Sequence, residues 1–208
     1  HPPSPGSYFF LGMDLWGSGN LQNAGGMLVQ AADRAAAKLP AQEAKHVWAM
    51  AVAETHALLK QYVSEAQCLP AWAPRWWLTA ESQRRASDKA VAYHPALSRG
   101  WEMRAIVYGN SGNAQLHDCD TTMRFKQLGG RAQRETVESY VQAARLAPMA
   151  SPRRALLERQ AIMCMSGYMA GTAIPPGDMG TLVAPGMRQG RHGMRHQYTR
   201  TSGRHKAT

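Results

Sequence analysis

Four consecutive residues near the middle of the chain are of types that bind metals or act as nucleophiles: His117, Asp118, Cys119 and Asp120. Imidazole, thiolate and carboxylate groups ligate zinc, and a thiolate activated by a histidine can attack a carbonyl carbon. Four adjacent side chains cannot all face one ion, and no Cys-x-x-Cys pair completes a ligand shell. Nothing elsewhere resembles a Ser-His-Asp or Cys-His arrangement. We therefore expect a solvated loop here, with no metal, no cofactor and no enzymatic activity.

The C-terminal segment, residues 171–208, is basic and is called the basic tail below. No acidic residue follows Asp178, and residues 179–208 supply +6 of the net charge of +10. Gly, Ser, Thr and Gln lie between the basic residues without apolar periodicity, so we expect the tail to become ordered only against a partner. Spaced arginines favour phosphate contacts, which makes rRNA one predicted partner. An acidic protein or anionic lipid surface is the other. The predicted contact residues are Arg188, Arg191, Arg195, Arg200, Arg204 and Lys206.

Aromatic residues offer a second kind of binding surface. Residues 1–20 are rich in Pro and Gly, and we expect them to form an extended N-terminal arm that presses its aromatic side chains onto a neighbouring protein. Near Arg75, Trp76 is expected to fill the groove between two helical hairpins, whereas the adjacent Trp77 must point elsewhere and is expected to meet another subunit. The predicted protein interface comprises Tyr8, Phe9, Phe10, Trp16, Trp72 and Trp77.

Helices are expected to position these side chains. Prolines divide the chain into segments of helical period, and no period-two strand pattern is present, so the predicted fold is all-α. The clearest helix, 42–67, has an apolar stripe formed by Trp48, Val52, Thr55, Leu59, Tyr62, Val63 and Ala66. Ser98 is expected to cap the fourth helix. The expected helices are 21–38, 42–67, 74–92, 98–109, about 132–147 and one from 152, within a helical domain 21–170 that carries an insertion at about 110–131.

Two stretches, Pro70–Ala80 and Pro95–Ala105, share a proline, a tryptophan six residues later and an alanine four residues after that. With other residues they resemble the tetratricopeptide-repeat family, whose repeat unit is a helical hairpin. The first-helix pattern is carried by Trp101, Ala105, Tyr108 and Gly112, and the second-helix pattern by Tyr140, Ala143 and Pro148. Further matches are Trp76 with Ala80 (first helix), Ala90 with Pro95 (second helix), Tyr62 with Pro70, and Ala35 with Pro40.

This resemblance implies an array of helical hairpins that docks proteins, usually without catalysis. The family's clamp for a C-terminal peptide carboxylate needs asparagine at first-helix positions that Glu81 and Ile106 occupy here. Capture of a C-terminal carboxylate is therefore not expected.

The remaining features concern the cellular compartment and the assembly in which the protein acts. Three cysteines, an odd number without Cys-x-x-Cys spacing, argue against a disulfide framework and favour reduced, buried thiols. No apolar run is long enough to span a bilayer. The first residue is His1 rather than Met, which suggests a fragment or a removed targeting peptide, and hence an organelle, mitochondrial by our prediction. We expect a structural or adaptor subunit of a large multiprotein assembly; the alternative is a mitochondrial ribosomal or other RNA-binding protein.

Overall fold

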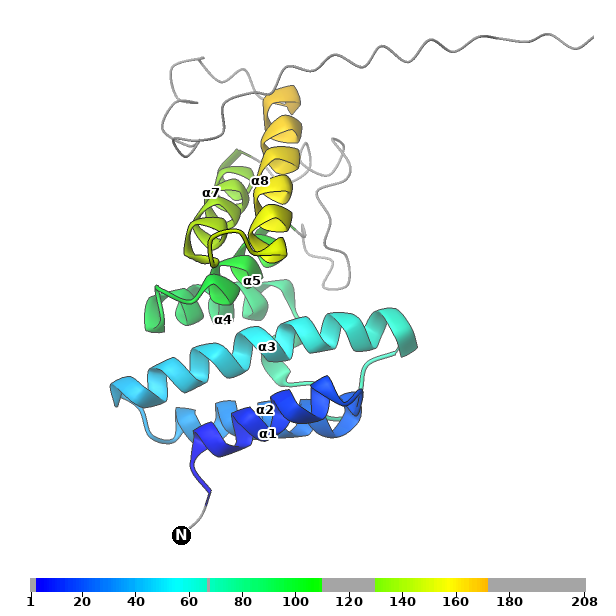
Figure 1. Ribbon diagram of the computed structural model, residues 1–208, viewed down its shortest axis with the longest axis vertical. Helices are drawn as coiled ribbons and strands as arrows, with labels where there is room; N and C mark the ends of the chain where they lie inside the picture. Colours follow the sequence, from blue (N-terminus) through cyan, green and yellow to red (C-terminus); the bar gives the residue numbers. More distant parts are fainter. Residues whose placement is uncertain (1–2, 67, 110–129, 172–208) are drawn as a thin grey trace, which may run out of the picture.

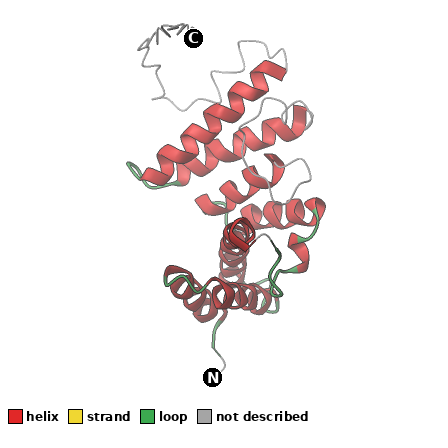
Figure 2. Cartoon of the chain, turned by 90° about the vertical axis from the view of Figure 1, so that its right-hand side faces the viewer, coloured by secondary structure: helices red, strands yellow, loops and turns green. Residues whose placement is uncertain are grey.

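A computed structural model describes residues 3–66, 68–109 and 130–171 of the 208-residue chain (Figure 1). These residues form helices and loops and contain no strand, which confirms the all-α prediction (Figure 2). The insertion expected at about 110–131 lies outside the described residues except for its last two positions. The helices are α1 (Pro5–Gly17), α2 (Leu21–Ala36), α3 (Gln42–Ala66), α4 (Ala80–Tyr93), α5 (Ser98–Gly109), α7 (Gly130–Leu146) and α8 (Pro152–Gly171), with a single 3₁₀ turn η1 (Arg75–Trp77).

The N-terminal segment is not the extended arm that its Pro and Gly content suggested. Residues 5–17 form α1, and Ser4 caps it by accepting a hydrogen bond from the Ser7 backbone N–H at 3.2 Å. Pro5 follows in the first helical position, where a missing N–H costs nothing. A serine followed by proline is a helix-start signal, and it outweighs the glycines later in the segment.

Two other helix starts differ from the expectation. The third helix begins at Ala80 rather than at 74, because Thr79 caps it by accepting from the Ser82 backbone N–H at 3.1 Å. Ser98 does start α5, but it is not the predicted cap. Its hydroxyl donates instead to the Ala143 carbonyl of α7 at 2.8 Å, which ties the two helices together. The remaining helices begin and end within about two residues of the predicted positions.

The helices pack on their neighbours in chain order, an arrangement compatible with a helical repeat. Each of α1 to α4 packs on the next helix along the chain, α5 packs on α7, and α7 packs on α8. In addition α3 contacts α1 on one side and α5 on the other. In Figure 1 the order runs from α1 and α2 at the bottom, through α3, to α7 and α8 at the top. None of the helices in the described ranges is long and apolar enough to cross a bilayer.

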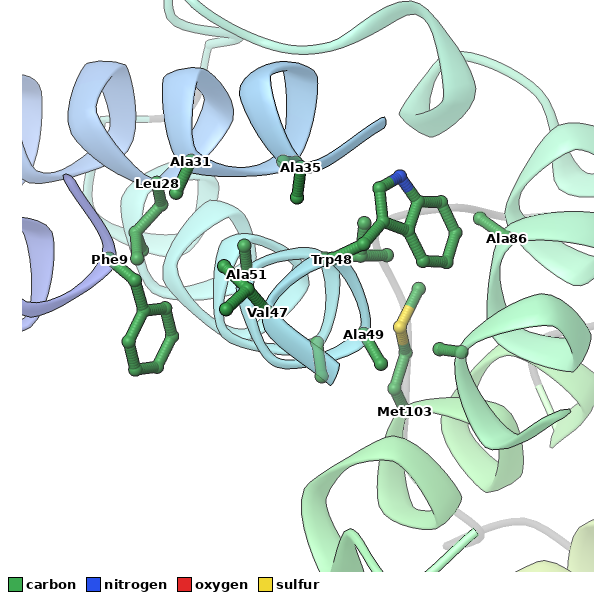
Figure 3. Close-up of a cluster of buried hydrophobic side chains, with 14 of the residues drawn as sticks. Phe9, Leu28, Ala31, Ala35, Val47, Trp48, Ala49, Ala51, Ala86 and Met103 are labelled. Atoms are coloured by element: carbon green, nitrogen blue, oxygen red, sulfur yellow. The ribbon is translucent and has the colours of Figure 1, made fainter. Parts of the chain in front are cut away.

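Small side chains dominate the main core. Its buried members include Phe9, Leu28, Trp48 and Met103 (Figure 3), but alanine is the commonest type. Alanine on facing helices lets their axes approach closely, because the contact distance is set by side-chain size. A second cluster, centred on Tyr140 and Leu157, joins α5 to α7 and α8. The buried alanines of the main core are Ala24, Ala31, Ala32, Ala35, Ala49, Ala51, Ala53, Ala86 and Ala90.

The cysteines correct another expectation. Cys164 is buried and disulfide-bonded, and Cys68 is an exposed free thiol. The expectation of reduced, buried thiols is therefore wrong for both residues: Cys164 is buried but not reduced, and Cys68 is reduced but not buried. An odd cysteine count does not prevent a single bridge, since one thiol can remain unbridged.

Because Trp72 packs closely on α2, a side chain added at Gly25 is expected to lower the stability of the fold. Trp72 lies in the connection after α3, donates from its indole N–H to Gln22 at 3.2 Å, and covers Gly25 so closely that an added Cβ would overlap its ring. Next to it, Gly26 has no neighbouring heavy atom within 4 Å of such a Cβ. We expect Gly25→Ala to lower the free energy of unfolding by about 1–3 kcal/mol through overpacking.

Gly26→Ala is the matched control, and we expect it to raise the free energy of unfolding by about 0.5–1 kcal/mol through helix propensity. Urea denaturation monitored by circular dichroism measures both. Equal effects of the two substitutions would show that Trp72 does not pack against Gly25.

Candidate functional site

The aromatic residues of the N-terminal segment do not act as one exposed group. Phe9 is buried in the main core, and Tyr8 is half-buried beneath the Arg34 guanidinium, 4.4 Å from the ring centroid. Phe10 has 66% of its surface exposed. Trp16 is half-buried and faces α3. Of the four predicted interface residues in this segment, Phe10 is the one that the chain leaves most open.

The tryptophans near residue 75 also differ from the prediction. Trp77 is only 2% exposed and packs with Leu59 and Val63 of α3, so the expectation that it meets another subunit is wrong. Trp76 is half-buried against the same cluster. It belongs to η1 rather than to a helix, so its pairing with Ala80 as a first-helix pattern is also wrong. Trp72 is half-buried against α2, and the connection between α3 and α4 therefore folds inward through all three indoles.

The predicted basic contacts lie outside the described residues. They are Arg188, Arg191, Arg195, Arg200, Arg204 and Lys206. The loop at residues 117–120 lies outside them as well. Within the part of the chain that is described, no group of three or more His, Cys, Asp and Glu side chains is placed to hold a metal ion.

A pocket of about 450 Å³ opens between α1, α3 and α5 and is called the inner pocket below. Most of its lining comes from one face of α3, with one residue from α1 and four from α5. Its walls combine apolar side chains with charged groups. The lining residues are Trp16, Ala53, His56, Ala57, Lys60, Gln61, Ser64, Arg99, Glu102, Met103 and Ile106.

Two hydrogen bonds fix the α1 side of the inner pocket. The Trp16 indole N–H donates to Gln61 Oε1 at 2.8 Å, and Gln61 Nε2 in turn donates to Glu65 Oε1 at 2.9 Å. Because an indole N–H donates and never accepts, the chain of bonds sets the orientation of the Gln61 amide. Trp16 is therefore held as a rigid wall of the pocket, although it was predicted to contact another protein.

On the α5 side, Arg99 forms a network of ion pairs. Its Nε lies 3.1 Å from both carboxylate oxygens of Glu54 on α3, and its Nη1 lies 3.0 Å from Glu102 Oε2. Glu102 also pairs with Arg153 of α8. Two carboxylates are thus shared between two guanidinium groups, and the network links three helices that are far apart in sequence.

Lys60 is the exception to this pairing. It is half-buried on α3, and among the described residues it forms neither a hydrogen bond nor an ion pair within 4.0 Å. Burial lowers its pKa from 10.5 to about 8, opposed by the charge of Glu102 and reinforced by that of Arg99. Desolvation disfavours a charged amine. Within the described part of the chain, the inner pocket therefore contains one cation that forms no ion pair with a carboxylate.

Sequence reasoning did not single out Lys60, Arg99 or Glu54 as a site. The pair Arg99 and Glu54 is separated by 45 positions, and no local spacing signals such a contact. A weak signal existed at Lys60, which directly follows the apolar run Ala57-Leu58-Leu59 on a helix predicted to be a core element. Charge within such a run indicates either a solvated edge or a polar pocket.

Comparison of the chain with protein-family models, with curated proteins and with solved structures gave no match.

Because the amine of Lys60 is partly buried, we expect it to lower the free energy of unfolding by an amount that depends on pH. The pKa is lower in the folded protein than in the unfolded chain, so between about pH 8 and 10.5 the unfolded chain binds more protons. The free energy of unfolding contributed by this group therefore rises with pH across that window, and the charged form is destabilising below it. We expect Lys60→Met to be more stable than wild type by about 1–3 kcal/mol near pH 7, after allowance for solvent screening.

The difference between Lys60→Met and wild type is expected to close as the pH approaches 10.5. Urea denaturation at several pH values measures it, with Lys45→Met on the same helix as the control for loss of a lysine. A difference that stays constant across the window would contradict the assignment of a desolvated amine.

Proposed function

We propose that this chain is a non-catalytic scaffold or adaptor of the tetratricopeptide-repeat type that docks other proteins of a larger assembly. The packing supports this arrangement. Of the alternate helices, α3 contacts both α1 and α5, while α2 and α4 lie between them along the chain. Ala105 of α5 and Ala143 of α7 are both fully buried in the cluster between those two helices, where the family's repeat needs small residues.

The observation that carries the proposal is the exposure of large apolar side chains on the two end helices. On α1, Phe10 and Leu11 are 66% and 48% exposed, and on α8, Leu156 and Ile162 are 50% and 48% exposed. An array of hairpins buries each helix between its neighbours, so its end helices keep one uncovered face. Apolar residues on such a face favour association with another protein.

The proposal is tested at Phe10. We expect wild-type protein, tagged and isolated under native conditions from its source cells, to migrate in a particle several times larger than its own mass of 22.8 kDa. Phe10→Ser should shift it toward the size of the free chain, because the anchor of the α1 contact is lost. Native gel electrophoresis measures the shift, and circular dichroism confirms that helicity is unchanged, as expected for an exposed position.

Leu78→Ser is the matched control, since Leu78 is 55% exposed but lies between η1 and α4, away from both end helices. We expect this variant to remain in the particle. Wild-type protein that migrates as a free chain, or a Phe10→Ser variant that stays assembled, would rule out docking through α1.

A second candidate function, RNA binding, follows from the charge of the basic tail, whose residues 179–208 supply +6 and contain no acidic residue. In this proposal the tail contacts phosphates of ribosomal or other RNA. We expect replacement of Arg188, Arg191, Arg195, Arg200 and Arg204 by Gln to abolish retention on RNA and to flatten its salt dependence. Filter binding at increasing salt measures both, and unchanged binding would exclude the tail as an RNA contact.

A further inference from the structure

The inner pocket has an unbalanced charge. The titratable and charged groups around Lys60 are His56 and Glu54 on α3, Arg99 and Glu102 on α5, and Arg153 on α8, while α1 contributes Trp16 to the lining. Glu54 and Glu102 are both engaged by guanidinium groups. Two carboxylates facing two guanidinium groups and one ammonium leave one positive charge without a direct counter-ion among the described residues.

The shape and chemistry of the inner pocket limit what could supply that counter-ion. At about 450 Å³ it has the size of a pocket for a small group rather than for a folded domain. Ala53, Ala57 and Ile106 provide apolar surface beside the ammonium, which suits the methylene groups of an acidic side chain. The pocket is open to solvent along one side, so a polypeptide can pass across its mouth while one side chain enters.

We propose that the inner pocket binds the side-chain carboxylate of a glutamate or aspartate in an acidic segment of a partner protein, with Lys60 as its ion-pair partner. This inference rests on the proposed docking function and assigns it a second contact, separate from the exposed face of α1.

A carboxylate that enters the inner pocket would neutralise the positive charge of Lys60. Only the protonated amine attracts the carboxylate. In the free protein the pKa of Lys60 is lowered to about 8, so the competent fraction falls as pH rises through that value. The apparent affinity is then expected to weaken by about tenfold between pH 7 and pH 9.

The test uses two neutral-ended probes that differ in one group, N-acetyl-glutamate α-amide and N-acetyl-glutamine α-amide. Binding is followed by NMR through the Trp16 indole N–H, which lines the inner pocket and is assigned with Trp16→Phe. We expect the glutamate probe to bind wild-type protein with a millimolar Kd and the glutamine probe at least about tenfold more weakly. The glutamate affinity should fall above pH 8.

Lys60→Met is expected to lose binding of the glutamate probe, and it should fold, because it removes a desolvated charge. Lys45→Met is the control. Lys45 lies about 22 Å from Lys60 along the axis of the same helix, and its ammonium lies over the Tyr93 ring. It should bind as wild type does, with the same pH dependence. Equal binding of the two probes, retention of binding in Lys60→Met, or an affinity independent of pH would each overturn the assignment.

A blocked pentapeptide with a central glutamate between alanines separates a peptide ligand from a small free carboxylate. We expect it to bind about threefold or more tightly than the single amino-acid probe, because its backbone crosses the open side of the inner pocket. Equal or weaker binding would overturn the peptide assignment. The assembly test at Phe10 does not involve Lys60, so failure of the inner-pocket proposal and failure of the docking function are distinguishable.

Discussion

The burial of α3 from several sides is the constraint on which the rest of the structure depends. This 25-residue helix contacts α1, α2, α4 and α5, and its buried residues include neighbours in sequence such as Ala51, Val52 and Ala53. A helix surrounded in this way must be apolar around most of its circumference. Each polar residue it carries must therefore find a partner or lie at a gap between the surrounding helices. Glu54 meets the first condition and Lys60 the second.

Much of the fold could be predicted because local signals mark helix ends. Prolines 40, 95 and 148 follow the ends of α2, α4 and α7 by two to four residues, and Pro152 begins α8. The errors arose where two local signals conflicted. In α1 the Ser4-Pro5 start competes with several glycines, and before α4 the paired prolines and tryptophans obscure the cap at Thr79. Helix capping decided both cases, since a satisfied first turn is sufficient to start a helix.

The candidate site was beyond sequence reasoning because it depends on contacts between distant helices. A single stripe on α3 predicted Trp48, Val52 and Leu59 as buried, but it could not reveal that a second face would pack on α5. The indole of Trp77 gave a similar error: its position beside Trp76 suggested exposure, whereas the folded connection turns it onto α3. Which faces become covered is a property of tertiary packing rather than of local periodicity.

The two arginines of α5 show what is unusual about Lys60. Arg104 pairs with Asp88 of α4 and Glu135 of α7, just as Arg99 pairs with Glu54 of α3. Both arginines of α5 are thus matched by carboxylates from adjacent helices, because an unmatched buried charge lowers stability. Two other half-buried cations, Arg84 and Lys45, lie instead over the rings of Tyr108 and Tyr93. Lys60, at the wall of the inner pocket, has neither kind of partner among the described residues. A residue that costs stability and forms no hydrogen bond or ion pair within the described part of the chain is explained by the proposed interaction with a partner, and a positive charge there selects an anionic group.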